Sequence, residues 1–184
     1  MVRPVAPTRR PRRRGPTVRG ARNRLPAEPG ARLRLLGDHD ALFAAIRDAL
    51  VRARRGRGDT GRTIVAGQSL GGVAALAFAA AHPDVVDQVL AYSPSVWWRP
   101  GRTARPSDVT AREDWIHALV AGCPSGAFGI RLASGRFEEE LTPGVAALAD
   151  TARTAGHDVS HTVYAGGHDE VWWAALLLDH LTSA

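Results

Sequence analysis

The sequence predicts an α/β fold in which a parallel sheet is flanked by helices. Short apolar runs rich in Val and Ile alternate with longer runs that have helical spacing. From residue 38 onward the order is helix, strand, helix, strand, helix, strand, helix, strand, helix. This order favours parallel strands joined by right-handed crossovers. Polar side chains able to do chemistry follow three of the strands, so we expect them at one edge of the sheet.

Residues 1–36 differ in composition from the rest of the chain. They contain 11 Arg and one acid, Glu28, whereas the whole chain has a net charge of +6, so the remainder is mildly acidic. The segment holds half of the 12 Pro and has no apolar period, and we expect it to be disordered. An arm that binds nucleic acid is one interpretation, although the segment has no aromatic side chain for base stacking. We favour a leader without function over such an arm. A further alternative is that an upstream part of a longer gene is lost or read in another frame.

Composition also limits the class of protein. A chain of 184 residues with 45% hydrophobic content suffices for one domain, which we place at residues 37–184. No apolar run is long enough to cross a membrane, and no apolar stretch behind the Arg-rich start suggests a secretory signal. Cys123 is the only cysteine, which excludes an internal disulfide and fits a reducing, cytoplasmic compartment.

The first half of the predicted domain contains two helices and two strands. A helix is expected over residues 38–55, with Asp38 or Asp40 as its cap and one apolar stripe. A short strand over 64–66 leads through a Gly-rich turn into an Ala-rich helix, which ends at His82 because Pro83 follows. A second buried strand is expected over 85–92.

The second half repeats the alternation. After a loop at 101–109, a helix is expected over 111–121 and a third strand over 128–133. A helix over 143–156, closed by Gly156, precedes a fourth strand over 159–164. The last helix is expected over about 170–181, with Asp169 as its cap.

The turn after the first strand carries the strongest motif. Gly67-Gln68-Ser69-Leu70-Gly71 is a G-x-S-x-G pattern between a strand and a helix, the context of a nucleophile elbow. In such a turn Ser69 has a strained backbone, and the Leu70 N–H at the helix N-terminus points at an oxyanion. Positions 67 and 71 are both expected to need small residues, since larger ones would meet the returning helix. The alternative is a Gly-rich turn whose Ser has no chemical role.

Two further groups follow later strands. The acids Glu138, Glu139 and Glu140 follow the third strand, and His168 follows Gly166-Gly167 after the fourth. The chain order Ser, acid, His is that of α/β hydrolases, in which the His activates the Ser and the acid orients the His. We choose Glu138 because it is nearest to the strand end. A solvated acidic run and an ordinary turn histidine are the alternatives.

Trp97 and Trp98 follow the second strand at the same expected edge of the sheet. They suit either a pocket for an aromatic substrate or a hydrophobic plug over the sheet, and both interpretations stay open. No metal site or cofactor is expected, because the chain has no H-E-x-x-H, no P-loop, no G-x-G-x-x-G and one cysteine.

Three segments resemble one family. Gly67-Gln68-Ser69-Leu70-Gly71-Gly72, Ser93-Pro94-Ser95-Val96-Trp97-Trp98 and Gly166-Gly167-His168-Asp169 are similar to the enterochelin esterase (ferric enterobactin esterase) branch of the esterase D-like α/β hydrolases, over roughly residues 38–184. The resemblance implies a cytosolic serine esterase that cleaves the trilactone of a catecholate siderophore and releases its iron. It implies Ser69 as nucleophile and His168 as base. Gly135-Arg136-Phe137-Glu138 looks like the family's G-x-x-E segment, which supports Glu138 as acid.

The chain departs from that family before the Ser69 turn. Members carry several more strands there, and often an N-terminal β-sandwich domain. The sequence therefore predicts the C-terminal part of a catalytic domain, without the loop that supplies the second oxyanion N–H. A catalytically inactive fragment or binding module is the alternative to an esterase. The oligomeric state is left open.

Overall fold

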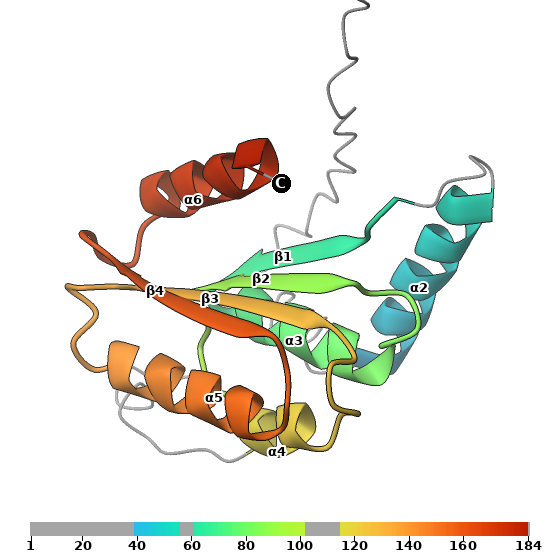
Figure 1. Ribbon diagram of the computed structural model, residues 1–184, viewed down its shortest axis with the longest axis horizontal. Helices are drawn as coiled ribbons and strands as arrows, with labels where there is room; N and C mark the ends of the chain where they lie inside the picture. The colour runs from blue at the N-terminus through green and yellow to red at the C-terminus, as the bar shows by residue number, and fades with distance from the viewer. Residues whose placement is uncertain (1–38, 56–60, 102–114, 184) are drawn as a thin grey trace, which may run out of the picture.

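The computed structural model describes residues 39–55, 61–101 and 115–183 (Figure 1). Its elements in chain order are α2 (His39–Arg55), β1 (Ile64–Gln68), α3 (Leu70–Ala81), β2 (Gln88–Tyr92), α4 (Trp115–Ala121), β3 (Gly129–Gly135), α5 (Thr142–Thr154), β4 (Val159–Tyr164) and α6 (Glu170–Ser183). This alternation confirms the predicted α/β fold. The expectations for residues 1–36, for the loop after residue 101 and for the start of the helix at 111 lie outside the described residues.

The four strands form one parallel sheet in the order β1-β2-β3-β4. In its register Ala66 pairs with Leu90, Leu90 with Arg131, and Leu132 with His161. Every residue of β2 is buried, as expected of a central strand with helices over both faces. Because all strands run the same way, the segments that follow them gather at one edge of the sheet.

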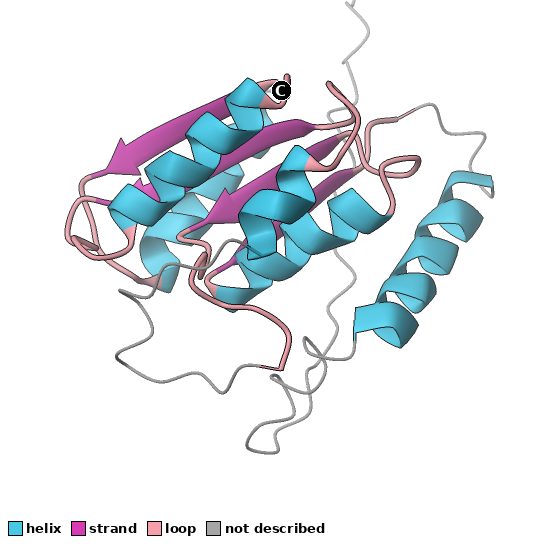
Figure 2. Cartoon of the chain, turned by 90° about the horizontal axis from the view of Figure 1, so that it is seen from below, coloured by secondary structure: helices cyan, strands magenta, loops and turns pink. Residues whose placement is uncertain are grey.

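Helices cover both faces of the sheet. Helices α3, α4 and α5 lie on one face and α6 on the other, and the view from below shows the first group in front of the strands (Figures 1 and 2). The main core joins the three helices to the sheet through residues such as Leu76, Ile116, Val145, Val89 and Leu132. Helix α2 joins this core through Phe43, whose ring meets Phe78 edge-on at 5.3 Å.

Strand β2 begins later than predicted. Val85 and Val86 are buried but precede the strand, because the Val85 N–H donates to the His82 carbonyl in a turn that leaves α3. These two residues are apolar because they pack in the main core. Apolar character alone does not distinguish a buried turn from a buried strand.

A smaller core lies under α6. It consists of Leu90, Tyr92, Ala133, Tyr164 and Trp173. Helix α6 begins directly after the turn that carries His168, and the Asp169 carboxylate accepts the N–H groups of Val171 and Trp172 at 3.1 and 3.2 Å. This confirms Asp169 as the cap. Among the described residues, no helix is both long and apolar enough to span a bilayer.

Candidate active site

Ser69 lies in the sharp turn between β1 and α3. Its φ of 53° and ψ of −126° are outside the regions that non-glycine residues usually adopt, which costs about 1–3 kcal/mol. The Ser69 carbonyl accepts the N–H of Gly72 at 3.0 Å, which closes the first helical turn behind it. The strained backbone lifts the Ser69 side chain away from both elements and into a cavity.

The two glycines of the turn have different surroundings. A Cβ at Gly67 would lie 2.0 Å from the Gly71 carbonyl oxygen, so the close approach of β1 to α3 requires glycine there. A Cβ at Gly71 would meet nothing within 4 Å. The expected need for a small residue is thus borne out at Gly67, whereas at Gly71 there is room for a methyl group and the expectation about larger side chains stays a prediction.

Ser95 is a polar neighbour of the Ser69 side chain. The two Oγ atoms are 3.3 Å apart, and the Ser95 N–H donates to the Ser69 carbonyl at 3.1 Å. Leu70 is the first residue of α3, so its N–H is among those that have no acceptor within the helix. A hydroxyl and a helix N-terminus thus meet at one point.

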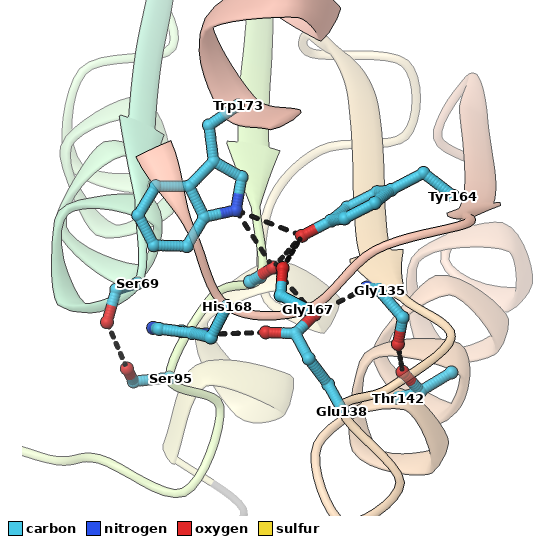
Figure 3. Close-up of polar contacts among 10 residues, drawn as sticks. Ser69, Ser95, Gly135, Glu138, Thr142, Tyr164, Gly167, His168 and Trp173 are labelled. Carbon is cyan, nitrogen blue, oxygen red and sulfur yellow. Dashed lines mark hydrogen bonds and ion pairs between the residues drawn. The ribbon is translucent and has the colours of Figure 1, made fainter. Parts of the chain in front are cut away.

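His168 follows β4 and Glu138 follows β3, and the structure brings the two side chains together. Glu138 Oε1 lies 2.5 Å from His168 Nδ1. The His168 ring is half-exposed and lies between Glu138 and Ser69 (Figure 3). Trp173 of α6 meets this ring edge-on at a centroid distance of 4.8 Å. The Nε2 edge of His168 is therefore the part that faces the cavity.

The Glu138 carboxylate is only 8% exposed and is surrounded by donors. Its Oε2 accepts the Ser93 hydroxyl at 2.8 Å and the Gly135 N–H. Burial by itself raises the pKa of Glu138, but the hydrogen bonds from His168, Gly135 and Ser93 outweigh it and hold the pKa below the usual 4.5. Glu139 and Glu140 are exposed. Of the three acids, Glu138 is the one bonded to His168.

These side chains surround a cavity of about 470 Å³. Its described lining comprises Ser69, Ser95, Trp97, Phe137, Glu138, Glu139, Glu140, Leu141 and His168. Ser69 and His168 thus open on the same space, with an aromatic wall formed by Trp97 and Phe137. A cavity of this size suits a small-molecule ligand.

The two adjacent tryptophans have different surroundings. Trp97 is half-buried: it lines the cavity and also packs against the main core, so its contact with a substrate stays a prediction. Trp98 does not line the cavity. Its side chain is 2% exposed, belongs to the main core and packs edge-on against Trp115 at a centroid distance of 5.6 Å. The expectation of Trp98 as a pocket residue is corrected. Neighbouring side chains in this segment point to opposite sides, so one can line the cavity while the other fills the core beneath it.

Four residues at the site had no role in the sequence analysis. Ser93, Tyr164 and Trp173 form hydrogen bonds behind Glu138, and Phe137 is 70% exposed at the cavity. Ser93 and Phe137 lie inside the segments that carry the family resemblance, which was the available signal. No signal in the sequence marked Tyr164 or Trp173, because an aromatic residue at a strand end or on an apolar helix is usually a core residue.

The arrangement contains the groups that acyl transfer needs. One cavity is surrounded by three such groups. They are the hydroxyl of Ser69, whose backbone is strained, the His168 imidazole paired with the ionised Glu138 carboxylate, and the N-terminus of α3. Within the described ranges, no three His, Cys, Asp or Glu side chains are grouped to hold a metal ion.

Comparison with known proteins agrees with this chemistry. A family described as "Putative esterase" matches residues 40–184. The iron(III) salmochelin esterase of Escherichia coli O6:H1 (strain CFT073) is 38% identical over 122 residues, which are 66% of this chain and 30% of that protein. The iron(III) enterobactin esterase of Dickeya dadantii (strain 3937) is 33% identical over 129 residues, 66% of this chain and 29% of that protein.

A solved structure extends the likeness to three dimensions. The crystal structure of the ferric enterobactin esterase from Salmonella typhimurium superposes with a TM-score of 0.66 and 26% identity, covering 84% of this chain and 39% of that one. The chain thus spans about 30% of the length of the curated relatives it matches. With the match over residues 40–184, the chain belongs to the esterase family that includes the enterobactin and salmochelin esterases.

Proposed function

We propose that this chain is a serine esterase in which Ser69 is the nucleophile, His168 the general base and Glu138 the acid that orients it. The observation that carries the proposal is the 2.5 Å contact of Glu138 Oε1 with His168 Nδ1, made by a ring that shares a cavity with Ser69. A carboxylate on Nδ1 leaves Nε2 free to take a proton, and it stabilises the imidazolium that results.

The reaction proceeds in two halves. Ser69 Oγ bonds to the ester carbonyl carbon while its proton passes to His168 Nε2, and the carbonyl oxygen becomes an oxyanion beside the Leu70 N–H. The carbon–oxygen bond to the leaving alcohol then breaks, and His168 returns the proton to that oxygen. Water, deprotonated by His168, attacks the acyl-Ser69. The carboxylic acid leaves, and the proton returns to Ser69 Oγ.

Ser69 changes partners in this scheme. Its Oγ lies 3.3 Å from Ser95 Oγ in the structure, and it turns to His168 when the ester enters the cavity. Free-enzyme hydrogen bonds of nucleophiles are often long and tighten only in the substrate complex. Ser95 therefore serves as the resting partner of the nucleophile.

For the substrate we propose an ester with an aromatic acyl group, of the catecholate siderophore trilactone type. Trp97 and Phe137 give the cavity apolar aromatic walls that suit such rings. The relatives are named for iron(III) salmochelin and iron(III) enterobactin. Cleavage of a trilactone ester in an iron complex would loosen the iron, which is cargo of the substrate and not a cofactor of the protein.

A binding module without turnover is the second candidate. In α/β hydrolases the second oxyanion N–H comes from a loop after an earlier strand, and β1 is the first strand of the described sheet. Removal of one oxyanion donor costs about 10²–10³ in kcat. A module of this kind would bind the ester and hydrolyse it at a rate near that of the buffer.

The test compares wild type with Ser69→Ala in two assays. We expect a fluorophosphonate probe to label the wild type and not Ser69→Ala, and p-nitrophenyl ester turnover to disappear with the label. Ser160→Ala is the matched control, because Ser160 is exposed on β4 away from the cavity, and it should behave as wild type. Hydrolysis of a catecholate trilactone, with and without iron, then tests the substrate. Equal labelling and turnover in wild type and Ser69→Ala would refute the proposal, and trilactone binding without hydrolysis would favour the binding module.

A further inference from the structure

Two buried hydroxyl groups lie behind Glu138, on the side away from His168. Ser93 is 0% exposed, and its Oγ lies 2.8 Å from Glu138 Oε2 and 2.9 Å from the hydroxyl of Tyr164. The indole Nε1 of Trp173 lies 3.1 Å from both oxygens. Figure 3 shows Tyr164 and Trp173 converging on this point from β4 and α6. Polar atoms from the segments that follow β2 and β3, from β4 and from α6 thus meet behind the acid.

Counting protons fixes the direction of these hydrogen bonds. An ionised carboxylate only accepts, so Ser93 gives its single proton to Glu138. An indole N–H only donates, so the oxygens of Ser93 and Tyr164 are its acceptors. Tyr164 also has a single proton, and because Ser93 gives its own to Glu138, the Tyr164 proton lies between two acceptors, Ser93 Oγ and the Gly167 carbonyl oxygen. The Ser93 hydroxyl therefore points toward Glu138, and the Trp173 N–H points toward the Ser93 oxygen. A group of this kind favours the ionised, fixed form of the carboxylate.

The same group also holds the turn that carries His168. The Tyr164 hydroxyl donates to the carbonyl of Gly167, the residue before His168, at 2.9 Å. The ring of Trp173 meets the His168 ring edge-on at 4.8 Å. Tyr164 and Trp173 thus contact the His168 turn on one side and the Ser93–Glu138 pair on the other.

The backbone of Ser93 points to a specific requirement for its side chain. Its φ is 45°, a conformation that favours glycine, yet the position holds a fully buried serine. Its N–H donates to the Ala133 carbonyl at 2.6 Å, which ties this strained residue to the end of β3. Strain at a buried non-glycine residue persists where the surroundings over-determine it, and it is concentrated at functional sites.

We propose that Ser93, Tyr164 and Trp173 are positioning residues that select Glu138 as the acid and hold it against His168. This inference rests on the proposed function and deepens it, since none of the three touches the reacting atoms. It explains why Glu138, rather than Glu139 or Glu140, bonds to His168: among the three, Glu138 is the acid whose second oxygen accepts the buried Ser93 hydroxyl.

Tyr164→Phe is the sharpest variant, because it removes one oxygen and keeps the ring that stacks on Trp172 at 5.5 Å. We expect kcat to fall about tenfold with KM within about twofold, since a buried hydrogen bond is lost and no substrate contact is. We also expect the acid limb of the pH profile of kcat/KM to move to lower pH, because a misdirected Glu138 stabilises the imidazolium less. A merely structural defect lowers the active fraction equally at every pH and leaves the limb in place.

Tyr92→Phe is the matched control. Tyr92 is the only other tyrosine, it belongs to the same small core, and its side chain has no hydrogen bond to Glu138 or to the His168 turn. It should keep wild-type kcat and the wild-type pH profile. A tenfold loss in both variants, or in neither, would overturn the proposal. Trp173→Phe, which removes the shared N–H donor, gives the same test if Tyr164→Phe does not fold.

A double-mutant cycle separates positioning from independent effects. If Tyr164 acts through Glu138, then adding Tyr164→Phe to Glu138→Gln should lower kcat by less than about twofold. A full further tenfold loss in the double variant would show that Tyr164 acts on something other than Glu138, and the proposal would fail.

A readout without turnover keeps this test apart from that of the proposed function. The proton between His168 Nδ1 and Glu138 should give a far-downfield NMR resonance in wild type and in Tyr92→Phe, and this resonance should move or broaden in Tyr164→Phe. An unchanged resonance refutes the positioning role even in an active esterase. A changed resonance in a protein that lacks Ser69-dependent turnover supports the positioning of Glu138 and refutes only the esterase function.

Discussion

Glu138 and His168 are 30 positions apart in the chain, and they meet because the loops after β3 and β4 lie against each other. The Phe137 N–H donates to the Gly166 carbonyl at 3.0 Å and joins the two loops. A Cβ at Gly135 would lie 2.4 Å from that same carbonyl oxygen, so only glycine permits the approach. The glycine of the G-x-x-E segment thus allows the two loops, and with them the acid and the imidazole, to meet.

Replacing the acid should remove most of the activity. We expect Glu138→Gln to lower kcat about 10²–10⁴-fold, because an amide neither fixes the His168 tautomer nor stabilises the imidazolium. Glu139→Gln and Glu140→Gln should change kcat of a neutral ester less than about threefold, since these exposed side chains do not bond to His168. Steady-state kinetics on a p-nitrophenyl ester measures all three. A larger loss in either neighbour would transfer the role of the acid to it.

The lowered pKa of Glu138 predicts how stability depends on pH. The folded protein binds this proton more weakly than the unfolded chain, whose Glu pKa is near 4.5, so the ionised carboxylate stabilises the fold above about pH 4.5. This contribution is lost as the pH falls through the folded pKa. The difference in Tm between wild type and Glu138→Gln should therefore narrow when the pH is lowered from 7 to 3. A difference that stays constant would contradict the assignment.

The two glycines around Ser69 should respond differently to the same substitution. Gly67→Ala places a methyl group 2.0 Å from backbone that cannot move freely, and we expect it to lower the free energy of unfolding by about 3 kcal/mol or more. Gly71→Ala enters open space on α3 and should be neutral or stabilising by about 0.5–1 kcal/mol. Urea denaturation compares them. Similar losses in both would mean that the turn is tighter at Gly71 than the structure shows.

The Trp97–Trp98 pair separates binding from stability. Trp98→Ala should lower the free energy of unfolding by about 3–5 kcal/mol, because a fully buried ring leaves a cavity beside Trp115. Trp97→Ala should cost less stability, because this ring is only half-buried against the same core, and it should raise KM for an aromatic acyl ester about tenfold relative to an acetyl ester. If Trp97→Ala shifts both KM values equally, the ring is not a wall for the acyl group.

The charge of the cavity predicts a dependence on salt. Its nine described lining residues include three Glu and no Arg, so the lining itself disfavours an anionic ester, although the exposed Arg99 and Arg136 lie in the segments that carry Trp97 and Phe137. We expect kcat/KM for an anionic ester to rise with ionic strength, and kcat/KM for a neutral ester to stay level. The double variant Glu139→Gln/Glu140→Gln should raise kcat/KM for the anionic ester about threefold at low salt. A fall with rising salt would show that basic groups dominate the approach.

Much of the site could be predicted because its signals are local. The strand, turn and helix around Ser69 follow from apolar spacing and two glycines, and the end of α3 follows from Pro83. The side of the sheet on which the candidate residues lie follows from the alternation of helices and strands, which makes the sheet parallel. The triad roles of Ser69, His168 and Glu138 stay predictions until the variants are measured.

Side-chain direction and long-range partners could not be predicted. Nothing in the local sequence separates Trp97 from Trp98, because which ring faces the cavity depends on how the segment leaves β2. The Ser93 hydroxyl bonds to two residues that are far from it along the chain. Tyr164 is 71 positions away and Trp173 is 80 positions away. Contacts of that range exist only once the sheet has formed and α6 has packed over it.

The sequence by itself determined the elements, their parallel order and the chemical identity of the groups at the strand ends, because spacing, glycine, proline and capping residues act over a few positions. Only the tertiary structure decided which of three adjacent glutamates bonds to His168, which tryptophan lines the cavity and which hydroxyls stand behind the acid. Those choices depend on the packing of loops against one another and on burial, where each donor is paired with an acceptor from a distant part of the chain.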